Sequence, residues 1–163
     1  RLRTVTGVQT CALPILRTSI LLCKESGIDG IVFGALDNEG RIDKKTCSEF
    51  VQLALPMEST FHRAFDEVQN PEEAMEQIIE CGFTRILTSG QKKTAMEGAE
   101  SISALIAKAN NRIAIMPGGG VRSSNITELK KRTGATEFHS AAVTSDTMIA
   151  DASEIQKLKS QLQ

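Results

Sequence analysis

The sequence predicts an α/β fold built on a parallel sheet. From about residue 19 onward, short apolar segments rich in β-branched residues alternate with segments of helical periodicity. Such alternation is typical of consecutive βαβ units, and short continuous apolar segments are typical of strands buried on both faces. The expected strands cover residues 30–36, 58–65, 84–89, 112–117 and 136–141.

The first two expected helices have recognisable ends. Residues 19–27 have helical apolar spacing and finish at Gly27, which suits a C-terminal cap. Residues 44–55 follow Asp43, whose side chain can cap the first turn, and they stop before Pro56. The second helix therefore connects the first two strands of the predicted sheet, and the first helix precedes them.

The clearest helix covers residues 70–82. Asn70 can cap it, Pro71 suits its first turn, acidic residues follow, and Gly82 closes it. Later strands are followed by similar segments, and these predict helices over residues 98–110, 123–134 and 151–163.

Bulk composition excludes several classes of function. The 163 residues are 40% hydrophobic and carry a net charge of −1, so we expect one ordinary core and no basic surface for nucleic acid. No apolar run approaches the roughly 20 residues that span a bilayer, so we expect no membrane partner. Outside the first 15 residues the cysteines are Cys23, Cys47 and Cys81. They are odd in number and form no Cys-x-x-Cys pair, which favours a reducing cytoplasm and buried structural thiols.

Residues 5–15, "VTGVQTCALPI", show neither helical nor strand periodicity. The string resembles the in-frame translation of a common sequencing adapter. We therefore interpret residues 1–15 as a non-native leader and residues 16–163 as the native, C-terminal part of a single domain. An ordinary divergent N-terminus is the alternative.

Polar residues that could do chemistry gather where the expected strands end. The ligand sites of parallel α/β proteins lie at the carboxyl ends of their strands, so these residues predict a shared site. The candidate catalytic residues are His62, Arg63, Asp66 and His139, and the candidate ligand-binding residues are Thr88, Ser89, Gly118, Gly119, Gly120 and Ser140.

The glycine cluster in "MPGGGVRSSN" is the sharpest of these signals. Glycines let backbone amides approach an anion closely, and a helix that opens at residues 123–125 would add its positive dipole end. The alternative is that the glycines only make a tight turn. The segment lacks the Gly-Lys-Ser/Thr sequence of a Walker loop.

Two further motifs carry histidines. In "TFHRAFD", strand alternation would place Phe61, Arg63 and Phe65 on one face and His62 on the other. Arg63 could orient a substrate or simply pair with Asp66. Two histidines at strand ends suit acid–base chemistry or metal ligation, but either could be a core histidine, and two alone match no structural metal site.

Five motifs in this order resemble the CutC family, which is named for copper homeostasis. They are "DGIVFGAL", "TFHRAFD", "LTSG", "MPGGG" and "GATEFH", and the resemblance covers residues 18–142. It implies a partial (β/α)₈ TIM barrel, with the five expected strands as the fourth to eighth strands of the family fold. It also implies a cytoplasmic protein that is a homo-oligomer when intact.

The resemblance predicts Cu(I) as the bound ion, although the cysteine positions that the family associates with copper precede this segment. The expected function is therefore CutC-like copper homeostasis, with Cu(I) binding and trafficking through soft thiolates. The alternative is a TIM-barrel enzyme that acts on a small phosphorylated or carboxylated metabolite.

Overall fold

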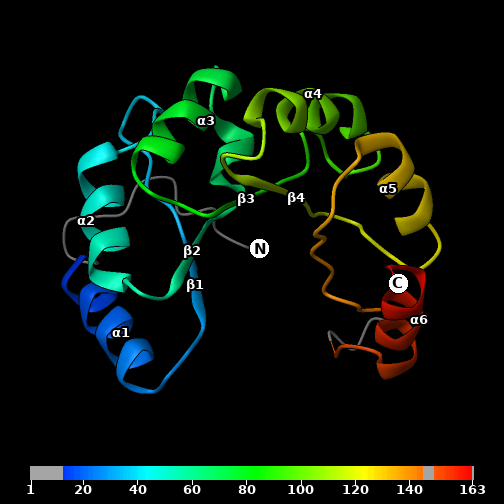
Figure 1. Ribbon diagram of the computed structural model, residues 1–163, viewed down its shortest axis with the longest axis horizontal. Coiled ribbons are helices and arrows are strands. Elements are labelled where there is room, and N and C mark those ends of the chain that lie inside the picture. Colours follow the sequence, from blue (N-terminus) through cyan, green and yellow to red (C-terminus); the bar gives the residue numbers. More distant parts are fainter. Residues whose placement is uncertain (1–12, 145–148, 163) are drawn as a thin grey trace. The chain divides into compact units, whose positions relative to one another are not determined.

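The computed structural model describes residues 13–144 and 149–162 (Figure 1). Most of the leader expected at residues 1–15 lies outside the described residues. Its last three residues begin helix α1, Leu13–Glu25. The chain divides into two compact units, one ending at Ile86 and one beginning at Leu87.

The four strands of the described residues form one sheet in the order β1-β2-β3-β4. The pairs β1–β2 and β2–β3 are parallel, and this confirms the predicted α/β class with a parallel sheet. The strands are shorter than the apolar segments that predict them. Their bounds are Gly30–Phe33 for β1, Glu58–Phe61 for β2, Arg85–Thr88 for β3 and Ala114–Pro117 for β4.

In the first unit, α2 (Lys44–Ala54) lies between α1 and α3 (Pro71–Glu80), as Figure 1 shows. The predicted caps are present. The side chain of Asp43 accepts a hydrogen bond from the Thr46 amide at 3.1 Å. The side chain of Asn70 accepts one from the Glu73 amide at 3.3 Å. These local bonds satisfy donors that a helix start leaves unpaired.

Aromatic side chains fill the core of the first unit. Phe33 and Phe83 have ring centroids 4.9 Å apart, and Phe61 lies 5.3 Å from Phe83 in an edge-on arrangement. Phe50 from α2 joins Phe33 at 6.0 Å. All four are almost fully buried, so this cluster holds α2 against the strands.

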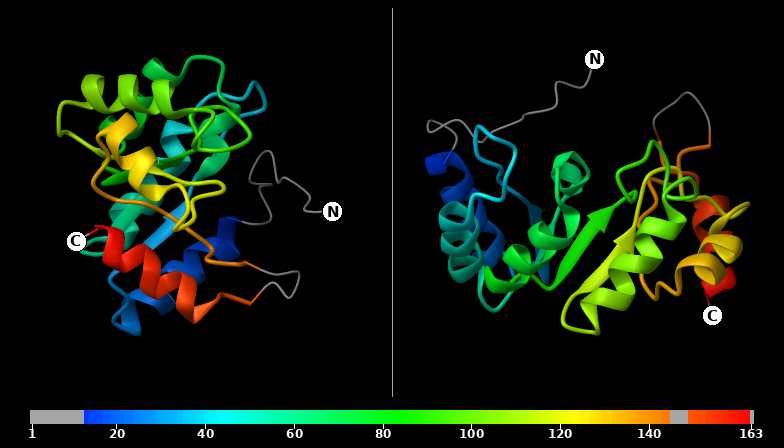
Figure 2. Two further views of the ribbon diagram at one scale, coloured as in Figure 1. Left: turned by 90° about the vertical axis from the view of Figure 1, so that its right-hand side faces the viewer. Right: turned by 90° about the horizontal axis from the view of Figure 1, so that it is seen from above.

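In the second unit, α5 (Ile126–Thr133) lies between α4 (Ala99–Ala109) and α6 (Ala152–Leu162) (Figures 1 and 2). Helix α5 ends at Gly134 in the left-handed conformation, as predicted. Helix α4 ends in the same way at Asn110. Leu129 and Ile102 are fully buried where these helices pack.

Two strand predictions are wrong. Residues 136–141 form no strand, and only an isolated parallel bridge joins Gly118 to His139. The strand expected over 58–65 ends at Phe61, and Arg63–Glu67 form a 3₁₀ helix, η1. Period-2 alternation therefore does not orient Arg63, because side chains alternate between faces only in extended backbone.

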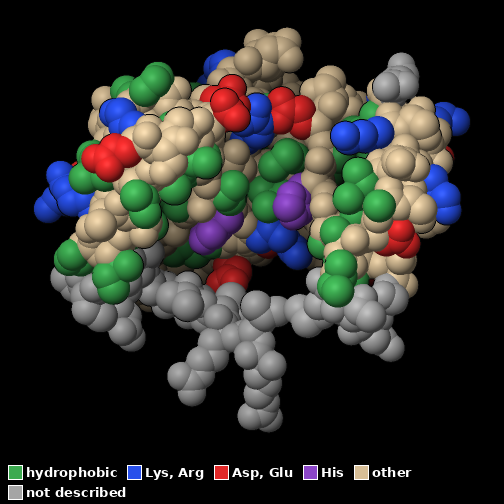
Figure 3. Space-filling view, turned by 90° about the horizontal axis from the view of Figure 1, so that it is seen from below, with side chains coloured by type: hydrophobic (Ala, Val, Ile, Leu, Met, Phe, Trp, Pro, Cys, Tyr) green, Lys and Arg blue, Asp and Glu red, His purple; other side chains and the backbone are tan. Residues whose placement is uncertain are grey.

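Several large apolar side chains reach solvent, and Figure 3 shows such side chains on one face. Val32 in β1 is 62% exposed although its neighbour Phe33 is buried. No helix among the described residues is long and apolar enough to cross a bilayer. The exposed set is Ile15, Leu21, Leu22, Ile28, Val32, Leu55, Ile149 and Ile155.

Candidate functional site

His62 follows β2 directly and caps η1. Its Nδ1 accepts a hydrogen bond from the Ala64 amide at 3.3 Å, so the neutral ring carries its proton on Nε2. The ring packs against Gly34, where a Cβ would lie 2.9 Å from Nδ1. Burial is the main cause that lowers the pKa of His62. A neutral imidazole that presents Nε2–H would donate a hydrogen bond to a ligand.

Arg63 and Asp66 form an ion pair inside η1. Nε of Arg63 donates to Oδ2 of Asp66 at 2.8 Å. The Asp66 side chain is only 10% exposed, whereas that of Arg63 is 43% exposed. The structural pairing that the motif allowed is therefore present, and Asp66 holds the guanidinium near the end of β2.

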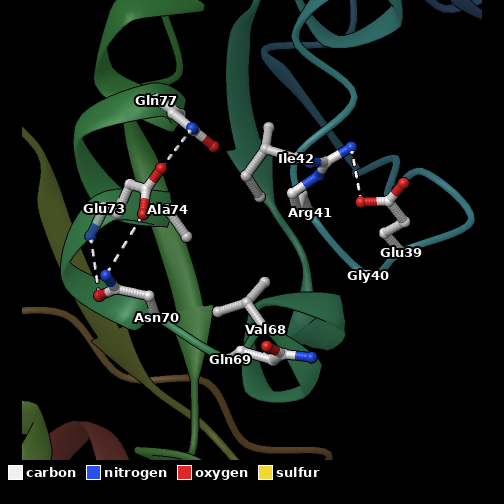
Figure 4. Close-up of a pocket in the computed structure, with 10 residues that line it drawn as sticks. All are labelled: Glu39, Gly40, Arg41, Ile42, Val68, Gln69, Asn70, Glu73, Ala74 and Gln77. Atoms are coloured by element: carbon white, nitrogen blue, oxygen red, sulfur yellow. Dashed lines mark hydrogen bonds and ion pairs between the residues drawn. The ribbon is translucent and has the colours of Figure 1, made fainter.

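A pocket of about 150 Å³ lies between the loop after β1 and the start of α3 (Figure 4). Ile42, Val68 and Ala74 give it an apolar floor. Its rim carries Arg41, which pairs with Glu39 at 3.0 Å. Sequence reasoning did not single out any of these side chains.

In the second unit, Thr88 and Ser89 are fully buried at the end of β3. Oγ1 of Thr88 accepts from the Gly90 amide, and the Ser89 hydroxyl donates to the carbonyl of Lys92. A Cβ at Gly98 would lie 1.9 Å from the Ser89 carbonyl oxygen. These two predicted ligand-binding residues thus support the loop between β3 and α4.

The glycine loop, Gly118–Gly120, follows β4. The Gly118 amide donates to the Thr88 carbonyl, and the Gly119 carbonyl accepts from the Ala95 amide. Gly119 has φ +99° and Gly120 φ +73°, a region that favours glycine. Among the described residues, no partner is within hydrogen-bond range of the Gly119 and Gly120 amides. Two backbone donors are therefore left over.

The start of α5 differs from the prediction. The Ser123 amide and hydroxyl both donate to the Glu154 carboxylate, at 2.6 Å each. Asn125 accepts from the Arg122 amide and donates to the Gly120 carbonyl, at 2.9 Å each. The sequence predicts that this helix start helps to bind an anion. Ser123 does not fit that prediction, because its amide and hydroxyl already donate to the Glu154 carboxylate.

Ser140 and Arg122 meet beside the glycine loop, whereas the side chain of His139 is exposed. The Ser140 hydroxyl donates to the Val121 carbonyl at 2.6 Å. Nη1 of Arg122 donates to the same carbonyl at 2.7 Å and to the Ser140 hydroxyl oxygen at 3.4 Å. The backbone amide of His139 bonds to Pro117. The Arg122 guanidinium therefore lies against the carbonyl of Val121, the residue that follows the glycine loop.

The three described thiols, Cys23, Cys47 and Cys81, are free cysteines. Cys47 and Cys81 are buried, and their Sγ atoms lie 3.7 Å from the carbonyl oxygens of Ala35 and Lys44. Burial raises the pKa of Cys47 to about 12. Within residues 13–144 and 149–162, no three His, Cys, Asp or Glu side chains gather as a metal site. The burial of Cys47 and Cys81 is consistent with the structural role predicted for these thiols.

The predicted residues fall into two sets, one in each unit: His62, Arg63 and Asp66 in the first, and the glycine loop with its neighbours in the second. Sequence reasoning missed Arg122 and Glu154. Arg122 stands two residues after the glycines, so its position was a usable signal. Glu154 has no local signal, because its contact lies 31 residues away along the chain.

Comparisons with known proteins agree on one family. The family model described as "CutC family" matches residues 8–144. The mouse copper homeostasis protein cutC homolog is 46% identical over 128 residues, which are 78% of this chain and 47% of that protein. The human homolog is 44% identical over 130 residues, which are 80% of this chain and 48% of that protein.

One solved structure of this family is also similar to this chain. A CutC structure from Streptococcus agalactiae has a TM-score of 0.78 and 31% identity, and it covers 82% of this chain and 66% of its own. The chain spans about half the length of the curated relatives that it matches.

Proposed function

This chain belongs to the CutC family, and we propose that its glycine loop binds the phosphate or carboxylate group of a small metabolite. One observation carries the proposal. The amides of Gly119 and Gly120 have no partner among the described residues, and they follow a strand of a parallel sheet. Ligands of such sheets bind at the carboxyl ends of the strands, where unpaired amides can hold an anion.

The surroundings of the loop support an anionic ligand. Arg122 supplies a guanidinium, which suits the paired oxygens of a phosphate or carboxylate. Thr94 lies beside Gly120, since its Cγ2 is 3.5 Å from where a Cβ would stand. Thr94 belongs to the loop between β3 and α4, and Lys92 and Lys93 of that loop are exposed. The ligand would therefore be held by the backbone donors of the loop and by the Arg122 guanidinium.

The amides of Gly119 and Gly120 form the proposed anion-binding site, called the anion seat below. As an enzyme, the chain would need an acid–base group besides this site. His139 follows the glycine loop in the second unit and is exposed, and His62 in the first unit presents Nε2–H. Histidine is the commonest acid–base group of enzymes, so both side chains are candidates for this role. Arg63 can orient a substrate only through the face of its guanidinium that Asp66 leaves exposed.

Titration with inorganic phosphate, followed by amide NMR, tests the anion seat. We expect the Gly119 and Gly120 amides to shift with saturation, whereas chloride at equal ionic strength shifts neither. Arg122→Gln should weaken phosphate binding about tenfold, because it removes one charged donor, worth about 1.4 kcal/mol. Lys131→Gln removes one positive charge from an exposed position of α5 and serves as the matched control. Amides that do not respond to phosphate would exclude the proposal.

Cu(I) handling in the cytoplasm is the second candidate, favoured by the names of the mouse and human relatives. Here Cu(I) is the cargo. Cys23 is half-buried and is the most accessible thiol of the described residues. Competition against a Cu(I) chelator tests this role, with Cys23→Ser and Cys47→Ser compared. Retention of one Cu(I) that depends on Cys23 would support it, and loss of all Cu(I) to the chelator would count against it.

We also propose that β1–β4 and the His139 bridge correspond to the fourth to eighth strands of a (β/α)₈ barrel, and that the intact protein is a homo-oligomer. The likeness to the CutC structure supports the first statement. An experimental structure and light scattering of a longer family member would test both.

A further inference from the structure

The glycine loop is tied to the rest of the second unit at successive residues. The carbonyl of Gly119 accepts from Ala95, and that of Gly120 accepts from Asn125. The Val121 carbonyl accepts from the Ser140 hydroxyl. Glycines at positive φ have many accessible conformations, so these bonds keep the loop in one of them and leave its two free amides in place.

The last of these ties is the Glu154 carboxylate on Ser123. Glu154 belongs to α6 and is 5% exposed. Both of its oxygens accept, one from the amide and one from the hydroxyl, at 2.6 Å each. Bonds to an ionised carboxylate are about twice as strong as neutral ones, so this contact anchors the end of the loop firmly.

The hydrogen bonds to Glu154 and the charges around it favour its ionised form. The hydrogen bonds from Ser123 are the main cause that lowers the pKa of this carboxyl, and the charges of Lys157 and Arg122 lower it further. Its own helix is stabilised by Asp151, whose side chain accepts from the Ser153 amide at 2.8 Å. Helix α6 thus holds the ionised Glu154 carboxylate against Ser123.

We propose that Glu154 is a positioning residue for the anion seat: through Ser123, it holds the Gly118–Asn125 segment so that the Gly119 and Gly120 amides stay preformed for a ligand. This inference rests on the proposed function. Glu154 does not touch the ligand and acts through the loop. A preformed seat binds more tightly because ligand binding then orders fewer groups.

Sulfate is a suitable probe, because its charge does not change between pH 4 and pH 7. In the full 163-residue chain, we expect Glu154→Ala to weaken sulfate binding at the Gly119 and Gly120 amides at least fivefold. Glu154→Gln keeps an acceptor for the Ser123 amide and should recover most of the affinity. Glu128→Gln removes an exposed carboxylate from the first turn of α5 and should bind like the unchanged chain.

Affinity that is unchanged or tighter in Glu154→Ala would overturn the inference, since the carboxylate would then be neutral toward the ligand or compete with it. A second measurement needs no anion. Amide hydrogen exchange at Gly119 and Gly120 should be faster in Glu154→Ala than in Glu128→Gln, and equal rates would overturn the inference.

Failure of the proposed function gives a different result. In that case sulfate shifts no loop amide in the unchanged chain, while the exchange comparison still decides the role of Glu154. If Glu154→Ala does not fold, the unchanged chain provides the test. The Ser123 amide shift should then follow one carboxyl titration below the ordinary glutamate range, and no such titration would overturn the inference.

Discussion

Arg63 and Asp66 are joined at 2.8 Å within one turn of 3₁₀ helix. Both are candidate catalytic residues in the sequence, and the contact makes them a pair. The carboxylate is mostly buried, whereas part of the guanidinium faces solvent. Asp66 therefore orients the Arg63 guanidinium, and any contact of Arg63 with a ligand depends on that orientation.

Asp66→Asn should lower the free energy of unfolding by about 1 to 2 kcal/mol, because a hydrogen bond between charged groups becomes a weaker one. Urea unfolding followed by circular dichroism would measure the change. Glu67→Gln alters an exposed carboxylate of the same 3₁₀ helix and should stay within about 0.5 kcal/mol of the unchanged chain. Equal losses in the two variants would contradict the structural role of the pair.

His62 should make stability depend on pH. Its folded-state pKa is lowered by burial, so the folded chain holds the proton less tightly than the unfolded chain. The stability is fully present above the unfolded value near 6.5 and falls as the pH drops through the folded pKa. Urea midpoints at pH 7.5 and 5.5 would show this loss. His62→Asn, which keeps a capping acceptor, should reduce this loss of stability, and a loss of equal size in that variant would contradict the assignment to His62.

Gly98 should tolerate no side chain. A Cβ there would lie 1.9 Å from the Ser89 carbonyl oxygen, and backbone cannot move aside cheaply. Gly98→Ala is expected to cost about 3 kcal/mol. Gly134→Ala meets nothing within 4 Å and carries only the strain of φ +73°, about 1 kcal/mol. Thermal melts of the two variants would separate a close contact from a backbone preference, and a smaller loss for Gly98→Ala would argue against this packing.

The thiols of the described residues should react in a fixed order. Cys23 is half-buried, whereas Cys47 is buried and its pKa is raised to about 12. Only thiolates are alkylated quickly, so a brief iodoacetamide treatment at pH 7.5 should label Cys23 and leave Cys47 unlabelled until the chain is denatured. Peptide mass spectrometry would measure both. Rapid labelling of Cys47 in the folded chain would contradict its burial.

Local signals were sufficient for several helix ends. Asp43 and Asn70 cap the helices that they were expected to cap, and Gly134 takes the left-handed conformation that closes α5. Each of these interactions joins residues a few positions apart. Residues 136–141 were misjudged because a strand exists only through its partner, and the described pairing there is limited to the bridge between Gly118 and His139.

The sequence by itself determined the α/β class, the parallel sheet and the glycine loop after β4. Periodicity, caps and glycine clusters are properties of neighbouring residues, so local reasoning reaches them. Only the tertiary structure decided which donors of that loop remain free. It brought Glu154 from α6 to the Ser123 amide, and it left the Gly119 and Gly120 amides without a partner among the described residues. Contacts across 31 residues depend on how helices pack, and no local pattern encodes that packing.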